Sequence, residues 1–182
     1  MFKKFLISSA CLVAMTVGAV AADVGGPTGG AWYLRGDIGA SFSRDYSVFG
    51  SDEAVAFGAG IGYQYSDMFR TDITFDSAVG YDLNFGVDLD TYSVLLNGYF
   101  DLPLNSFIKP YVGAGIGYGW AEASGGGASV DDDGFAFAGM AGVTVDLTQQ
   151  MALDVGYKFR NISVSGQDVQ DHMVRAGVRF YF

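Results

Sequence analysis

A strict two-residue alternation of apolar and polar side chains, repeated along eight segments, constrains this chain more than any other feature. In the first segment, Trp32, Leu34 and Ile38 share one face, whereas Arg35 and Asp37 share the other. Successive side chains of a β-strand point to opposite faces, so the alternation predicts strands. Each segment has roughly ten residues, the length with which a tilted strand crosses a bilayer, and together they predict an all-β, eight-stranded antiparallel up-and-down barrel. The segments span residues 31–42, 57–65, 69–75, 92–100, 108–120, 135–146, 151–160 and 174–182.

The polar face is expected to line the inside of this barrel. Side chains just fill an eight-stranded barrel, so glycines and paired charges fit inside while bulky apolar residues face lipid. Buried charges must be paired. Because the first and last strands meet when the barrel closes, Asp37 is expected to pair with Arg175 or Arg179. A soluble sandwich, the alternative, would bury the apolar face instead. The predicted interior charges are Arg35, Asp37, Arg70, Asp72, Asp154, Lys158, Arg160, Arg175 and Arg179.

Aromatic residues are expected to form two belts with an aliphatic band between them. Membrane–water interfaces select such belts, whereas a soluble sandwich has no reason to sort aromatics by depth. One predicted belt contains Trp32, Tyr63, Tyr65, Phe69 and Phe100, and the other contains Trp120, Phe135, Phe137, Tyr157 and Phe159.

The first 22 residues have the pattern of a secretory signal peptide. Lys3 and Lys4 precede an apolar run that ends in the small residues AVAA. Such a segment is removed on export, so we expect residues 1–22 to be cleaved and residues 23–182 to form the barrel. Cys11 would leave with the leader, and the remaining chain would hold together without disulfides.

The connections between the predicted strands fall into two classes. Those at 66–68, 101–106 and 148–150 are short, whereas the other four run to about ten residues or more. Short periplasmic turns and long outer loops are typical of outer-membrane barrels. We therefore expect the short turns and both termini to face the periplasm, and the small-residue segment 123–133 to be a mobile outer loop.

Acidic residues are concentrated in the four longer connections. Residues 23–182 contain 8 basic and 20 acidic residues, a net charge of −12, which makes nucleic acid an unlikely partner. The longer connections with their strand edges hold Arg44 as their single base. Their predicted acidic residues are Asp45, Asp52, Glu53, Asp76, Asp82, Asp88, Asp90, Glu122, Asp131, Asp132, Asp133, Asp168 and Asp171.

The last eight residues, RAGVRFYF, resemble the assembly signal of outer-membrane barrels. In that signal a polar residue, a glycine and two aromatics stand at fixed spacings, and the second aromatic is the last residue of the chain. Arg175, Gly177, Phe180 and Phe182 fit the four positions. The alternative is an ordinary final strand. The resemblance implies that the barrel-assembly machinery reads this end.

The whole chain after the leader resembles the small eight-stranded outer-membrane barrels, the OmpA-like and OmpX-like transmembrane domains, and the porin-like surface antigens of Gram-negative bacteria. The stretches KPYVGAGIGYGW (109–120) and LNGYFDLP (96–103) carry this resemblance together with the terminal strand. It implies an integral outer-membrane protein without enzymatic activity or cofactor, monomeric, surrounded by lipid and lipopolysaccharide. Envelope integrity, adhesion or host interaction through the acidic loops are the implied roles.

Two other functions remain open. A narrow channel for ions or small solutes is the first alternative, because interior glycines leave gaps. A lipid-A-modifying enzyme is the second, since enzymes of that kind are also small barrels with an outward His and a Ser. His172 is the single histidine, and Ser163 and Ser165 are the nearby serines. The motif GAGIGY lacks the spacing of a dinucleotide-binding loop, and DDDG (131–134) lacks the alternating ligands of a calcium loop.

Overall fold

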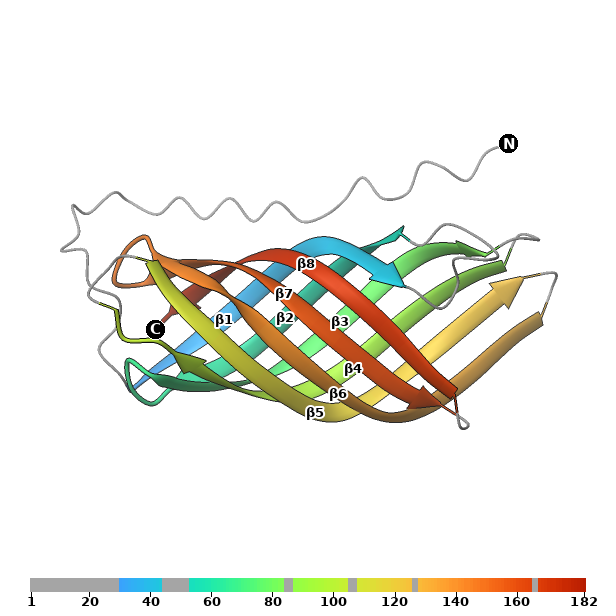
Figure 1. The fold of residues 1–182 in the computed structure, drawn as a ribbon, viewed down its shortest axis with the longest axis horizontal. Helices are drawn as coiled ribbons and strands as arrows, with labels where there is room; N and C mark the ends of the chain where they lie inside the picture. Colours follow the sequence, from blue (N-terminus) through green and yellow to red (C-terminus); the bar gives the residue numbers. More distant parts are fainter. Residues whose placement is uncertain (1–29, 44–52, 84–86, 105–107, 126–127, 165–166) are drawn as a thin grey trace.

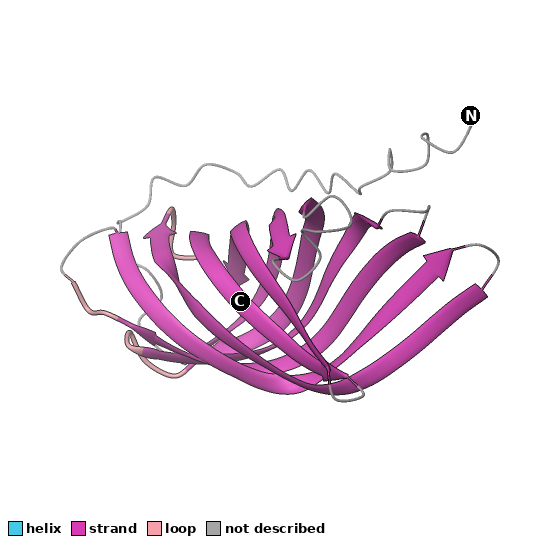
Figure 2. Cartoon of the chain, turned by 45° about the vertical axis from the view of Figure 1, so that its right-hand side comes forward, coloured by secondary structure: helices cyan, strands magenta, loops and turns pink. Residues whose placement is uncertain are grey.

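The computed structural model describes residues 30–43, 53–83, 87–104, 108–125, 128–164 and 167–182, and every regular element in this part of the chain is a β-strand. Each strand pairs antiparallel with the next and β1 pairs with β8, so the sheet closes into a barrel (Figures 1 and 2). The predicted eight-stranded up-and-down barrel is confirmed. Within the described residues, no helix has the length and hydrophobicity that crossing a membrane requires. The strands are β1 (Ala31–Ser43), β2 (Glu53–Gln64), β3 (Phe69–Leu83), β4 (Val87–Asp101), β5 (Ile108–Gly125), β6 (Ala128–Asp146), β7 (Met151–Val164) and β8 (Gln167–Tyr181).

Apolar side chains cover the outside of the barrel and polar side chains fill the inside. Leu34, Ile38 and Ile61 point outward and are 50%, 57% and 44% exposed, whereas Arg35 and Asp37 on the same strand as Leu34 are buried. A water-soluble protein rarely exposes an apolar surface this continuous. The distribution is that of a barrel surrounded by lipid.

Interior glycines make room for large side chains that cross the lumen. At Gly62 an added Cβ would lie 2.4 Å from Cζ of Tyr33, and at Gly156 it would lie 2.4 Å from the hydroxyl of Tyr111. Gly62 belongs to the first GAGIGY motif. The motif therefore serves packing, in keeping with the small interior of an eight-stranded barrel.

The strands continue further than predicted at one end of the barrel. The expectation of a loop at 123–133 is wrong for 123–125 and 128–133, and residues 126–127 lie outside the described residues. β5 and β6 pair without interruption up to Gly125 and Ala128. The connections at this end are residues 84–86, 126–127 and 165–166, besides 44–52. Antiparallel hairpins can continue into water with polar side chains. Such an extension lacks the apolar alternation from which the ends of the strands were predicted. We call this end of the barrel the hairpin end. The opposite end, which we call the turn end, contains the C-terminus and the connections 65–68, 102–107 and 147–150.

Four strands extend beyond the others at the hairpin end, at the right of Figure 1. β2 pairs with β3 only as far as Val79, and β7 pairs with β6 only as far as Gly134. Pairing among β3, β4, β5 and β6 continues past these residues. The extension is a four-stranded sheet that we call the projecting sheet. It comprises residues 81–83, 87–90, 121–125 and 128–133.

A β-bulge marks the point at which β3 enters the projecting sheet. The register with β4 shifts between Ala78 and Tyr81, and Gly80 between them has a φ of 95°, which favours glycine. The N–H of Gly80 donates a hydrogen bond of 3.1 Å to Oδ1 of Asp90 on β4. Bulges bend and twist the strand that contains them, and this one coincides with the end of the β2–β3 pairing.

Candidate functional surfaces: a closed lumen and a projecting sheet

The structure buries all nine charged residues that the sequence places inside the barrel. Each is at most 9% exposed, and each takes part in at least one ion pair with another strand or with a neighbour on its own strand. Ion pairs replace the hydration that these groups lose on burial. The nine are Arg35, Asp37, Arg70, Asp72, Asp154, Lys158, Arg160, Arg175 and Arg179.

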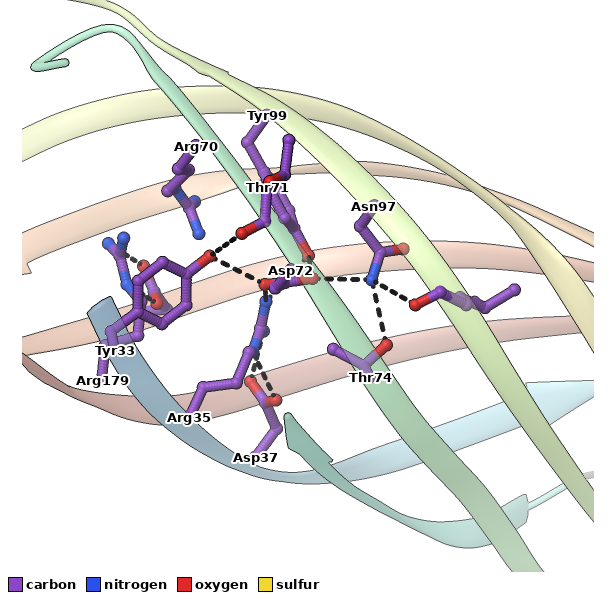
Figure 3. A network of polar contacts seen from close by, with 12 residues as sticks. Tyr33, Arg35, Asp37, Arg70, Thr71, Asp72, Thr74, Asn97, Tyr99 and Arg179 are labelled. Atoms are coloured by element: carbon purple, nitrogen blue, oxygen red, sulfur yellow. Dashed lines mark hydrogen bonds and ion pairs between the residues drawn. The ribbon is translucent and has the colours of Figure 1, made fainter. Parts of the chain in front are cut away.

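A network centred on Asp72 crosses the middle of the lumen (Figure 3). Arg35 donates from Nη1 to Oδ2 of Asp72 at 2.9 Å and from Nη2 to Oδ1 of Asp37 at 2.7 Å. The Tyr33 hydroxyl donates to Oδ2 of Asp72 at 3.0 Å, and the Asn97 amide donates to Oδ1 at 2.8 Å. One carboxylate therefore joins side chains of β1, β3 and β4.

Asp76 forms a second acidic centre nearer the hairpin end. Lys158 lies with its Nζ 2.6 Å from Oδ2 of Asp76, Arg175 binds Oδ1, and the Thr74 hydroxyl donates at 2.8 Å. The sequence analysis assigned Asp76 to a loop, and this assignment is wrong, because the residue is 1% exposed. Asp76 stands four residues after Asp72 on the same strand, and the two-residue period directs both carboxylates inward.

Arg160 closes the lumen at the hairpin end. Its Nε lies 3.0 Å from Oδ2 of Asp171, its Nη1 donates to Ser93 at 2.9 Å, and its Nη2 donates to Thr91 at 2.6 Å. Asp171 is fully buried, so its assignment to a loop is also wrong. It faces Arg160 directly in the β7–β8 register.

Arg70 occupies the turn end of the lumen. Its Nε lies 2.9 Å from Asp101, and its guanidinium carbon lies 4.0 Å and 4.9 Å from the ring centroids of Tyr99 and Tyr111. The two terminal nitrogens form no hydrogen bond within the described residues. The tyrosine faces supply cation–π contact to this group instead.

The predicted pairing of Asp37 with Arg175 or Arg179 is wrong. Asp37 forms its ion pair with Arg35, two residues away on the same face of β1. Arg179 reaches β7, where its Nε lies 2.7 Å from Oδ2 of Asp154. Arg175 joins the second acidic centre described above. Long arginine side chains reach across the lumen, so the register of the closing strands alone does not determine their partners.

The lumen is electrically balanced and filled. Its six buried bases are joined by Lys109, whose Nζ lies 2.8 Å from Asp146, and these seven bases face seven buried acids. A cavity between Arg35, Asp154 and Lys158 measures ≈ 10 Å³, about the space of one water molecule. The nine inward charges named above are at most 9% exposed, so side chains fill the lumen around them. The seven acids are Asp37, Asp72, Asp76, Asp101, Asp146, Asp154 and Asp171.

The ten predicted belt aromatics all lie on the outward face of the barrel. Trp32 contacts Tyr63 at a centroid distance of 5.2 Å, and Phe69 contacts Phe100 at 5.1 Å near the turn end. The five residues of the other predicted belt are Trp120, Phe135, Phe137, Tyr157 and Phe159, and they lie nearer the hairpin end. Seven of the ten are exposed, and Tyr63, Trp120 and Phe159 are half-buried.

Three residues of the predicted assembly signal lie on β8, and the fourth, Phe182, directly follows it. Arg175 and Gly177 are buried in the lumen, Phe180 is half-buried and Phe182 is 65% exposed. The N–H of Phe182 donates to the carbonyl of Trp32 at 3.0 Å. The end of the chain is thus fastened to β1, and its role in assembly stays a prediction.

The described residues do not bring His172 and a serine together. Ser163 donates to Asp168 at 2.7 Å, whereas Nδ1 of His172 shares a hydrogen bond with the Tyr157 hydroxyl on the neighbouring strand. Ser163 faces Asp168 in the register, and four residues of strand, about 13 Å, separate that position from His172. Ser165 lies outside the described residues. Nor do these residues hold three potential metal ligands in one group.

The projecting sheet is strongly acidic. Its residues include seven acids and no Lys or Arg, whereas every basic residue within the described ranges lies in the lumen. Glu122 and Asp133 expose their side chains there. The seven acids are Asp82, Asp88, Asp90, Glu122, Asp131, Asp132 and Asp133.

Known proteins are similar to this chain in fold and in sequence. An uncharacterized protein of Brucella abortus (strain 2308) is 30% identical over 207 residues, covering 79% of this chain and 73% of the relative. Neisserial surface protein A superimposes with a TM-score of 0.72 and 24% identity, covering 83% of this chain and 97% of the neighbour. Ail, the attachment invasion locus protein of Yersinia pestis, gives a TM-score of 0.59 and 20% identity, covering 84% and 100% of the two chains. The family described as outer membrane protein beta-barrel domain matches residues 7–182. This chain therefore belongs to the outer membrane protein β-barrel family and is an integral protein of the outer membrane.

Proposed function

We propose that this chain is a non-enzymatic protein of the outer membrane that attaches the cell to external partners through its acidic projecting sheet. The observation that carries the proposal is the division of charge. Seven bases neutralise seven acids inside the barrel, whereas the projecting sheet holds seven acids without a base. The lumen has little capacity left to act on a ligand, and the projecting sheet has a charge that a partner can neutralise.

The orientation is inferred from the strand extensions. We infer that the hairpin end faces outward and the turn end faces the periplasm, because β3 to β6 continue far beyond the lipid-facing aromatic residues only at the hairpin end, and outer-membrane barrels have their longer excursions outside the cell. The predicted signal peptide, residues 1–22, and the loop 44–52 lie outside the described residues. With this orientation the belt near Trp120 lies in the outer leaflet, where lipopolysaccharide is the neighbour, and the projecting sheet stands in the external medium.

The structural neighbours support an external role. One is named a surface protein and another an attachment invasion locus protein. Both resemble this chain at a level of identity that carries the fold alone, and their names motivate the proposal. Assembly through the terminal strand and a monomeric state in the membrane belong to the same proposal.

A filled lumen disfavours the narrow channel. The one cavity described at its centre measures ≈ 10 Å³, and the ion pairs around it would have to separate for a hydrated ion to pass. We expect conductance in planar bilayers to stay at the background of the empty membrane. Steady single-channel steps would favour the channel instead.

Expression in a non-adherent bacterial host tests attachment. Folding of the displayed chain is verified on a gel, where the unboiled, folded barrel migrates faster than the boiled protein. Cells that display the folded chain should bind cultured host cells, matrix protein or serum protein above the vector control. As a matched control, the exposed turn variant Asp67→Asn, at the opposite end of the barrel, should bind as the original chain does. Binding at the vector level to all three targets would contradict the proposal.

A further inference from the structure

We propose that the outer edge of β6, residues 128–132, takes up an extended basic segment of a partner protein as an additional β-strand. This inference deepens the attachment function proposed above and rests on it.

Neighbouring strands at the hairpin end have unequal lengths. β6 begins at Ala128, but its ladder with β7 begins only at Gly134. On the opposite side, β5 pairs with β6 continuously from Ala128 onward. Among the described residues, no strand pairs with 128–132 on the β7 side. This edge is about 17 Å long, the length of an ordinary strand.

The backbone of residues 128–132 pairs with β5 on one side and with no described strand on the other. In an antiparallel strand, alternate residues direct their N–H and C=O groups to opposite neighbours. Roughly half of the residues in 128–132 therefore present a donor and an acceptor away from β5. An edge of this kind is a template for another strand, and peptide recognition by strand addition uses it.

The other edge of the projecting sheet is less suitable. On β3 only residues 81–83 extend beyond the pairing with β2, and the bulge at Gly80 lies at their base. Bulges and short strands are the usual means of blunting an edge. The register between β5 and β6 shows no such shift along its length. The β6 edge is therefore the longer and more regular of the two.

The acidic charge of the projecting sheet favours a basic strand as the partner of this edge. The β6 edge contains Asp131 and Asp132, and the projecting sheet as a whole carries seven acids and no base. A second copy of this chain would bring like charges opposite one another, which destabilises strand pairing. A strand that alternates Lys or Arg with apolar residues would gain backbone hydrogen bonds and opposite-charge pairs together.

Amide hydrogen exchange on the barrel in lipid nanodiscs tests this inference. The probe is a synthetic peptide of alternating Lys and Val, and the matched control alternates Glu and Val. The Lys peptide should slow exchange of amides within 128–132 and leave the membrane-spanning part of β6 unchanged. The Glu peptide should leave exchange at 128–132 unchanged.

Two sets of variants separate backbone pairing from charge. Replacing Asp131, Asp132 and Asp133 by Asn should weaken Lys-peptide binding about eightfold, since each exposed ion pair contributes roughly twofold and the three factors multiply. Ser129→Pro and Val130→Pro remove N–H groups that point to opposite sides of β6. The substitution that removes an N–H directed away from β5 should abolish peptide binding. The variant should still fold, so its unboiled form should still migrate faster on a gel than its boiled form.

Several outcomes would overturn the inference. If the Lys peptide binds without protecting 128–132, the contact is surface charge alone. If the edge is protected in the absence of peptide as protein concentration rises, a second copy occupies it. If cells attach to partners but the peptide is not held, the edge inference is wrong and the attachment function stands. If the peptide is held at the edge but cells attach to nothing, the attachment function is wrong.

Discussion

Single residues in this barrel are constrained by the face of the strand on which they lie. An inward glycine meets the backbone or a crossing side chain, whereas an outward glycine meets lipid. Gly117 and Gly98 illustrate the difference on adjacent strands. A Cβ at Gly117 would lie 2.0 Å from the carbonyl oxygen of Val94, and a Cβ at Gly98 would meet nothing within 4 Å.

Gly117→Ala should therefore destabilise the barrel, and Gly98→Ala should not. Overpacking of a filled interior costs about 1–3 kcal/mol of the free energy of unfolding. A methyl group at Gly98 points outward and disturbs no contact within the barrel. The free energy of unfolding by urea in lipid vesicles measures both. Equal values for the two variants would contradict the assignment of the two faces.

A second residue-scale prediction concerns Asp76, which holds both Lys158 and Arg175. Asp76→Asn leaves two buried cations with a neutral partner, and loss of one member of a buried ion pair costs about 3–5 kcal/mol. Asp67→Asn, at an exposed turn, should change the free energy of unfolding by no more than about 0.5 kcal/mol. The same unfolding measurement applies, and a small effect of Asp76→Asn would show that the second acidic centre contributes little.

At the scale of elements, sequence alternation predicted the eight strands because each strand has one lipid-facing side that only apolar residues can occupy. It missed the extension of β5 and β6, because no lipid constrains residues beyond the aromatic belt. It also misassigned Asp76 and Asp171, since an acid near the end of an apolar pattern resembles a loop residue. Partners across the lumen, such as Arg160 with Ser93 of β4, depend on how far side chains reach and are not encoded by spacing along the chain.

The last strand, β8, gives a prediction that separates folding from assembly. Phe182 is 65% exposed and contributes one backbone hydrogen bond to Trp32. Its deletion should cost the folded barrel about 1 kcal/mol, so purified protein should refold into detergent and still migrate faster unboiled. In cells the same variant should accumulate in the periplasm if the terminal aromatic is read during assembly. Normal amounts of the variant in the outer membrane would show that RAGVRFYF is an ordinary strand and not an assembly signal.

At the scale of the whole molecule, the chain separates its charges into two compartments. Ion pairs fill the lumen, apolar and aromatic residues cover the lipid-facing surface, and the projecting sheet carries seven acids without a Lys or Arg in its sequence. The surroundings of each compartment determine its charges. Buried charges need partners and lipid excludes charged groups, whereas water accepts charged groups that have no partner. The central claim is that the projecting sheet is the functional surface of an otherwise closed barrel.

Removal of the projecting hairpin tests this claim most directly. Ala121 and Asp132 face one another in the β5–β6 register, so replacing residues 122–131 by Asn-Gly gives a two-residue turn of the type that hairpins favour. The barrel below is unaltered, and the variant should reach the membrane and migrate faster unboiled. The measurement is attachment of bacteria that display equal amounts of the original chain or of this variant. The account predicts that attachment falls to the level of the vector control, and undiminished attachment by the shortened barrel would contradict it.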